Sequence, residues 1–197
     1  DGTSNGTVLV KDIRPGSFGS GPSYLAAGTG AVFLSAYTTD SGQELWKSDG
    51  TSNGTVLVMD IAAGGMGSWP QSLTECSGVL YFSARDMVFG SELWRSDGTE
   101  EGTCLVRDIN PLGWGFPQFL IPFGGAVYFG ATDGANGMEL WKSDGTSNGT
   151  VLVKDIQPLG DSTPQDLTVL GGAFYFTAND GINGTELWKS DGTSNGT

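Results

Sequence analysis

Acidic and amide side chains gather in a short glycine-rich loop that recurs along the chain. In its two clearest copies the loop reads Asp-Gly-x-Asn-Gly-x-Glu. Carboxylate and amide oxygens on such a loop are the ligands that calcium takes, and no other cofactor is indicated. The candidate metal ligands are Asp86, Asp133, Asn136, Glu139, Asp180, Asn183 and Glu186. The spacing is not that of an EF-hand, so the alternative is an Asx-turn in which the carboxylates accept hydrogen bonds from loop amides.

A second group of candidates is aromatic. Phe18, Trp69 and Trp114 stand in glycine-rich segments, where the corresponding fourth segment has Asp161 instead. An exposed ring beside carboxylates can stack on the apolar face of a sugar while the carboxylates bond its hydroxyls. These three residues are therefore candidate ligand-binding residues for glycans. The alternative is that the rings cover the core beneath a loop.

The tripeptide Asn-Gly-Thr is a third chemical signal, because it is an acceptor sequence for N-glycosylation. It occurs at Asn5, Asn53, Asn148, Asn183 and Asn195. Asn-Gly is also a dipeptide that closes tight hairpin turns. The turn alone therefore accounts for the repeated sequence if the sites are not modified.

Charge and composition exclude several classes of function. The net charge is −13 with no histidine, which argues against nucleic acid and anionic membranes as partners. The longest apolar stretch is far too short to insert into a membrane. The commonest general base is missing, and the carboxylates recur in every repeat rather than forming one asymmetric pocket. We therefore expect no catalytic residues and a protein that is not an enzyme.

The elements that position these residues form a repeat. The octamer Glu-Leu-Trp-Lys-Ser-Asp-Gly-Thr begins at residues 44, 92, 139 and 186, with Arg95 as its single change. Each unit of 47 or 48 residues holds about four short apolar strands, the second of which has no polar face. That period and strand count are typical of the blades of a β-propeller. The sequence thus predicts an all-β fold of four four-stranded blades in a single domain, with a tryptophan of each octamer anchoring its blade.

The predicted blade boundaries leave one blade incomplete. The units span approximately 14–61, 62–109, 110–156 and 157–197, and the last lacks an outermost strand. Residues 1–13 contain such a strand, Thr7 to Ile13, with no blade before it. We expect residues 1–13 to complete the fourth blade and close a ring. The alternative is that they complete a blade of another copy, which gives head-to-tail filaments.

The octamer, followed by Gly-Thr-x-Leu-Val-x-Asp-Ile, closely resembles the bacterial ELWxxDGT repeat over essentially the whole chain. Only Thr99-Glu100-Glu101-Gly102 departs from the usual Thr-Ser-Asn-Gly. The resemblance implies a propeller-like architecture and an extracellular or cell-surface location. We interpret the chain as a structural or adhesive module without catalytic activity, with copies of itself or glycans as partners. A lectin-like module that uses the loop aromatics is the alternative. The chain lacks an initiator Met, so we expect a mature form or a segment of a longer protein.

Overall fold

The computed structural model describes residues 2–28 and 30–197, and these residues form strands and turns without a helix. The strands are β1 (Ser23–Gly28), β2 (Ala31–Thr38), β3 (Gly42–Ser48), β4 (Val56–Met59), β5 (Gln71–Cys76), β6 (Val79–Asp86), β7 (Gly90–Ser96), β8 (Cys104–Arg107), β9 (Gln118–Phe123), β10 (Ala126–Thr132), β11 (Met138–Ser143), β12 (Val151–Lys154), β13 (Gln165–Leu170), β14 (Ala173–Asn179) and β15 (Thr185–Ser190). The prediction of an all-β fold is confirmed.

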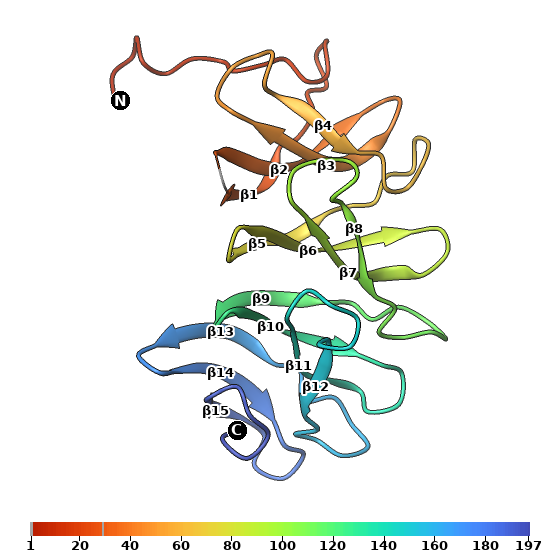
Figure 1. Cartoon of the computed structure of the whole chain (residues 1–197), viewed down its shortest axis with the longest axis vertical. Coiled ribbons are helices and arrows are strands. Elements are labelled where there is room, and N and C mark those ends of the chain that lie inside the picture. Colours follow the sequence, from red (N-terminus) through yellow and green to blue (C-terminus); the bar gives the residue numbers. More distant parts are fainter. Residues whose placement is uncertain (1, 29) are drawn as a thin grey trace.

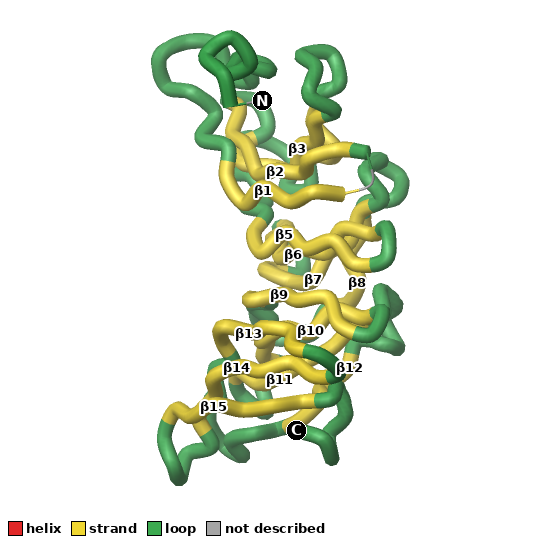
Figure 2. The backbone as a smooth tube through the Cα atoms, turned by 90° about the vertical axis from the view of Figure 1, so that its left-hand side faces the viewer, coloured by secondary structure: helices red, strands yellow, loops and turns green. Residues whose placement is uncertain are grey.

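The strands form antiparallel sheets in chain order. Three sheets have four strands each, β1–β4, β5–β8 and β9–β12, and the last, β13–β15, has three. The first strands of neighbouring sheets, β1, β5, β9 and β13, lie next to one another. Figure 1 shows the resulting array, in which the sheets follow one another along the long axis and the two termini lie at opposite ends. Figure 2 shows the same succession from the side.

Neighbouring sheets pack face to face through apolar side chains. Phe33 and Leu45 of the first sheet lie in one cluster with Phe82 and Trp94 of the second. Equivalent clusters join the second sheet to the third and the third to the fourth. The tryptophans of the first three octamers are at most 8% exposed. This packing explains why the second strand of each unit has no polar face.

The repeated octamer ends in a turn that its own side chains hold. Asp49 Oδ1 accepts hydrogen bonds from the Thr51 amide (2.8 Å) and the Thr51 hydroxyl (2.7 Å). The Thr51 hydroxyl in turn accepts one from the Gly54 amide (2.9 Å). The same bonds recur in the other three turns, including the one that departs in sequence. The divergent turn keeps its geometry because it retains the Asp, the Thr and the final Gly.

The predicted closure of the ring by residues 1–13 is not observed. Within the described part of the chain the last sheet has three strands, and residues 2–13 form no strand; Asp1 lies outside the described residues. Instead Ile13 packs beside Trp46 on the free face of the first sheet. The structure is therefore an open array, because the segment meant to close it lies at the opposite end from the sheet it would complete.

Two smaller sequence features are also resolved. Cys76 and Cys104 are free thiols, of which Cys76 is buried. Among the described residues there is no helical segment with the length and apolar character needed to span a bilayer.

The turn geometry predicts that Gly149→Ala destabilises the chain. A Cβ at Gly149 would lie 2.0 Å from Asp144 Oδ1, so the turn must open or the carboxylate must leave Thr146. We expect a loss of about 1–3 kcal/mol in the free energy of unfolding, the range for overpacking, measured by chemical denaturation. Gly172→Ala is the matched control, since its Cβ meets nothing within 4 Å. Equal losses for both variants would contradict the role assigned to Gly149.

Candidate functional site

The first residue of the octamer is a buried carboxylate that binds backbone amides. Glu44 is inaccessible to solvent and accepts hydrogen bonds from the amides of Ile61 (3.2 Å), Ala62 (3.2 Å) and Ser68 (2.8 Å). The Ser68 hydroxyl is a further donor. These donors lie in the segment that leads from the outermost strand to the next sheet. The glutamate thus fixes this connecting loop to its own sheet.

The same glutamate clamp recurs in the next two sheets. Glu92 accepts from the amides of Ile109 (3.0 Å) and Gly115 (2.7 Å). Glu139 accepts from the amides of Ile156 (2.7 Å) and Ser162 (3.1 Å), with the Ser162 hydroxyl at 2.7 Å. A buried carboxylate is tolerated only when such bonds replace its water. Each clamp therefore holds one connecting loop.

The predicted metal ligands do not converge in the structure. Asp133 Oδ1 accepts from the amides of Ala135 (2.9 Å) and Asn136 (2.8 Å), and its Oδ2 accepts from the Asn136 side chain (2.7 Å). This is the Asx-turn alternative. Glu139 is engaged by the connecting loop instead.

The other copies of the acidic loop follow the same pattern. Asp180 binds Asn183 through backbone and side chain, Asp86 accepts from the amides of Val88 (2.9 Å) and Phe89 (2.6 Å), and Glu186 is exposed. Across residues 2–28 and 30–197, no three His, Cys, Asp or Glu side chains lie close enough to hold a metal ion.

Burial dominates the electrostatics of the clamps. Removal from water raises the pKa of Glu92 from an ordinary value of 4.5 to about 7, against the opposing effect of the amide hydrogen bonds. The same cause raises the pKa of Glu44 and of Glu139. Protonation of these carboxyl groups is therefore linked to the folding of the chain.

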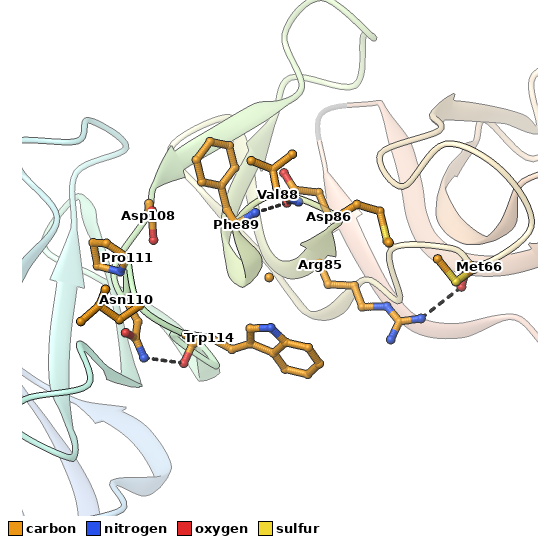
Figure 3. Close-up of a pocket in the computed structure, with 13 residues that line it drawn as sticks. Met66, Arg85, Asp86, Val88, Phe89, Asp108, Asn110, Pro111 and Trp114 are labelled. Atoms are coloured by element: carbon orange, nitrogen blue, oxygen red, sulfur yellow. Dashed lines mark hydrogen bonds between the residues drawn. The ribbon is translucent and has the colours of Figure 1, made fainter.

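Two of the three predicted aromatic residues meet in one cleft. Trp69 and Trp114, each 48% exposed, line a cavity of about 230 Å³ formed by the second sheet and the loops before and after it, together with Arg85 and Phe116. Arg85 and Trp114 also line an adjoining cavity of about 560 Å³, into which Figure 3 looks. We call these two adjoining cavities the aromatic cleft. The two cavities share Arg85 and Trp114 as lining residues.

Local backbone features place the rings of the aromatic cleft. Trp69 and Phe116 occupy equivalent positions before a proline, with φ of 53° and 48°. Left-handed backbone is uncommon for bulky residues. Trp114 lies across Gly90, where a Cβ would come within 2.1 Å of the indole. The Trp114 carbonyl accepts a hydrogen bond from the Asn110 side chain at 3.1 Å. The glycine is therefore needed for the position of the indole.

Polar groups flank the rings. Arg85 lies over the Trp69 ring with its guanidinium carbon 5.7 Å from the centroid, held by the carbonyls of Gly67 and Met66 at 3.2 Å each. Asp86 uses Oδ1 for the amides of its own loop, whereas the described residues supply no partner for its other oxygen. Figure 3 shows Arg85, Asp86 and Trp114 around one opening. The cleft thus combines stacking surfaces with a free acceptor and a cation.

Phe18 is separated from the aromatic cleft. It is 85% exposed and lines a different cavity of about 690 Å³ beside the first sheet. The Arg14 guanidinium carbon lies 5.4 Å from the Phe18 ring centroid. The acceptor sequences for glycosylation are on the surface, since Asn5, Asn53, Asn148, Asn183 and Asn195 are all exposed in turns.

Sequence reasoning missed the roles of four residues. It did not assign the clamp to Glu44 and Glu92, although the same Glu opens every octamer. It also overlooked Arg85 and Phe116. Phe116 could have been found by aligning the residue before each proline with Trp69, whereas nothing in the sequence alone places Arg85 over an indole.

Comparison with known proteins gives a fold. No family model and no curated protein matches the chain. Two solved structures of puromycin hydrolase are similar to it, one of them an S511A mutant in complex with PGG. The TM-scores are 0.60 and 0.59 (S511A), with 18% and 17% identity over 88% and 87% of this chain. The chain spans 27% of the length of each. These neighbours are β-propeller-like, so the sheets have a propeller-like arrangement.

The same comparison corrects the expectation that the chain is not an enzyme. Two solved structures with a similar fold are those of a hydrolase. The lack of histidine and the repetition of carboxylates are therefore not sufficient grounds for excluding an enzyme. At 17–18% identity the similarity concerns the fold and transfers no residue role.

The clamps predict a pH dependence of stability. Because the pKa of Glu92 is higher in the folded chain than in the unfolded one, the folded state binds more protons between pH 4.5 and about 7. The free energy of unfolding contributed by Glu92 is therefore fully present below pH 4.5 and is lost as the pH rises to about 7. Glu92→Gln removes this titration. Chemical denaturation at a series of pH values gives the free energy of unfolding of both chains. The value for the parent chain minus that for the variant should decrease from pH 4.5 to about 7.

The control for this experiment is Glu101→Gln, which alters an exposed glutamate of the second turn. This variant should follow the parent chain at every pH. A difference between parent and Glu92→Gln that stays constant or grows from pH 4.5 to 7 would show that the buried carboxyl does not titrate as described.

Proposed function

We propose that the chain is a carbohydrate-binding module of an exported, surface-associated protein, and that the aromatic cleft holds the sugar. The observation that carries this proposal is the meeting of Trp69 and Trp114, two half-exposed indoles from successive loops, in one cleft. Exposed indoles are costly in water unless a ligand covers them. A pyranose ring offers an apolar face for stacking and hydroxyls at its edge.

The polar groups of the aromatic cleft support a hydroxylated ligand. Among the described residues Asp86 Oδ2 has no partner and can accept from a hydroxyl. Arg85 lines the cavity together with both indoles and lies over the Trp69 ring. The net charge of −13 disfavours polyanionic ligands. Neutral glycans are therefore the chemical class that fits best. The extracellular setting rests on the resemblance of the octamer to repeats of exported proteins.

A structural or adhesive module is the second candidate. It is favoured by the recurring glutamate clamps, each of which fixes the loop that leads from its sheet to the next. Quasi-one-dimensional arrays of this kind suit extended scaffolds. The two proposals are compatible, since the clamps are buried and the cleft is on the surface.

The carbohydrate proposal predicts which substitutions abolish binding. A glycan array identifies a neutral glycan, and calorimetric titration with that glycan measures affinity. We expect Trp114→Ala and Trp69→Ala each to weaken binding at least about tenfold, because truncating a central tryptophan commonly costs 2 kcal/mol or more.

Phe18→Ala is the matched control, since Phe18 is an exposed ring in a different cavity. It should bind as the parent chain does. An array without any bound glycan, or equal weakening by Phe18→Ala, would refute the assignment of the aromatic cleft.

A further inference from the structure

The hairpin turn between β6 and β7 lacks a contact that the equivalent turns of the third and fourth sheets have. In those turns the aspartate binds loop amides through Oδ1, and the asparagine three residues later donates its side-chain amide to Oδ2 at 2.7 Å. Asp86 keeps the Oδ1 bonds, but Phe89 stands in the place of the asparagine. Within the described residues Asp86 Oδ2 therefore has no donor. The group that the turn lacks is an amide N–H.

A donor without an acceptor lies against the same turn. Trp69 Nε1 donates to the Met66 carbonyl at 3.0 Å, whereas no described residue accepts from Trp114 Nε1. A Cβ at Gly90 would come within 2.6 Å of the Trp114 indole nitrogen. Gly90 pairs with Asp86 across the hairpin, and residues paired in this way have Cα atoms about 4.5–5.5 Å apart. The unpaired N–H and the unpaired carboxylate oxygen thus belong to neighbouring positions of one turn.

Apolar side chains surround this donor and acceptor in the cavity of about 560 Å³. Val88, Phe89 and Leu112 are exposed to solvent, and all three line the cavity together with Asp86 and Trp114. Figure 3 shows Val88 and Phe89 beside Asp86 on one side of the opening and Trp114 on the other. Water can solvate the two polar groups, but contact with the apolar side chains is unfavourable for it. The cavity is therefore suited to a group that joins a donor and an acceptor to a small apolar part.

A second carboxylate of this cavity belongs to the repeat rather than to a ligand. Asp108 Oδ1 is buried and has no partner among the described residues. The equivalent oxygens of Asp60 and Asp155 are also buried without a partner, and Asp60 lines the cavity that contains Phe18. A feature that three sheets share does not account for a ligand bound beside one of them. Asp86 Oδ2 differs from its equivalents in the third and fourth sheets, which are paired with asparagine.

We propose that the sugar in the aromatic cleft carries an acetamido group, which binds at the turn between β6 and β7. The amide N–H donates to Asp86 Oδ2, as the asparagine side chains do in the equivalent turns. The amide carbonyl accepts from Trp114 Nε1, and the methyl group packs on the exposed apolar side chains of the cavity. A hydroxyl in this position supplies no apolar part, and an ammonium group supplies no acceptor. This inference rests on the proposed carbohydrate function and narrows its ligand to N-acetylated sugars.

Sugars that differ at a single carbon test this assignment. N-acetylglucosamine and N-acetylgalactosamine are compared with glucose and galactose, which have a hydroxyl in place of the acetamido group, and with the corresponding amines. Titration calorimetry or saturation-transfer NMR gives each dissociation constant. We expect at least one N-acetylated sugar to bind more tightly than its hydroxyl and amine counterparts by at least about tenfold, the contribution of one hydrogen bond to a charged group.

The readout for variants is the preference for the N-acetylated sugar over its hydroxyl counterpart. Asp86→Asn keeps an oxygen for the loop amides but puts an N–H in place of the unpaired acceptor, so the preference should disappear. Phe89→Asn supplies the internal amide of the other turns and should do the same. Phe89→Leu removes the ring without supplying an amide, so the preference should persist even where both affinities fall. Asp180→Asn makes the same exchange in the fourth sheet and is the matched control. Thermal melting checks that each variant is folded.

The outcomes separate this inference from the proposed function. Equal binding of the N-acetylated and hydroxyl sugars would overturn the acetamido assignment, as would tightest binding of the amine or an unchanged preference in Asp86→Asn. If glycans without an acetamido group bind and depend on Trp69 and Trp114, the carbohydrate function stands while the acetamido assignment fails. If no sugar binds, both fail.

Discussion

Everything else in this structure depends on a buried carboxylate that accepts backbone amides. Glu44, Glu92 and Glu139 have no access to water, and the hydrogen bonds that replace it come from the loop leaving the same sheet. A charge in this position is costly without donors, and the amides are costly without an acceptor. The carboxylate and the loop amides therefore stabilise each other, and this fixes the conformation of the connecting loop. Burial raises the pKa of these groups, which links their protonation to folding.

Clamping a loop at both ends leaves its middle free to differ. Each segment that leads into the first strand of a sheet contains a proline. The residue before it is Gly21, Trp69, Phe116 or Thr163, always with a positive φ between 46° and 54°. The backbone is therefore the same in each repeat, while the side chain it presents is not. Trp69 and Phe116 reach one cleft because their loops are successive and their backbones equivalent. The connecting loops thus present different side chains on one repeated backbone.

The similarity to parts of a hydrolase places the chain among propeller-like folds without assigning it a reaction. Blades of this architecture bury their faces on neighbours, and the end of an open array has none. Leu187 and Glu186 are exposed in the fourth sheet, whereas their equivalents in the first three sheets are buried between sheets.

The sequence by itself determined the all-β class, the repeat period, the strands and the turns, because these follow from local patterns. Alternating apolar residues specify strands, and Asp49, Thr51 and Gly54 specify a turn through bonds within six residues. It also singled out Trp69 and Trp114 as candidate ligand-binding residues.

Only the tertiary structure decided which of these residues meet. Glu139 could belong to the acidic loop before it or to the connecting loop after it, and the second is 17 residues or more away along the chain. The position of residues 2–13 depended on how the sheets are arranged in space, so sequence complementarity alone predicted the wrong end of the array. Contacts between distant segments depend on how sheets stack and which amides lack partners. Those are properties of the folded chain that no local pattern contains.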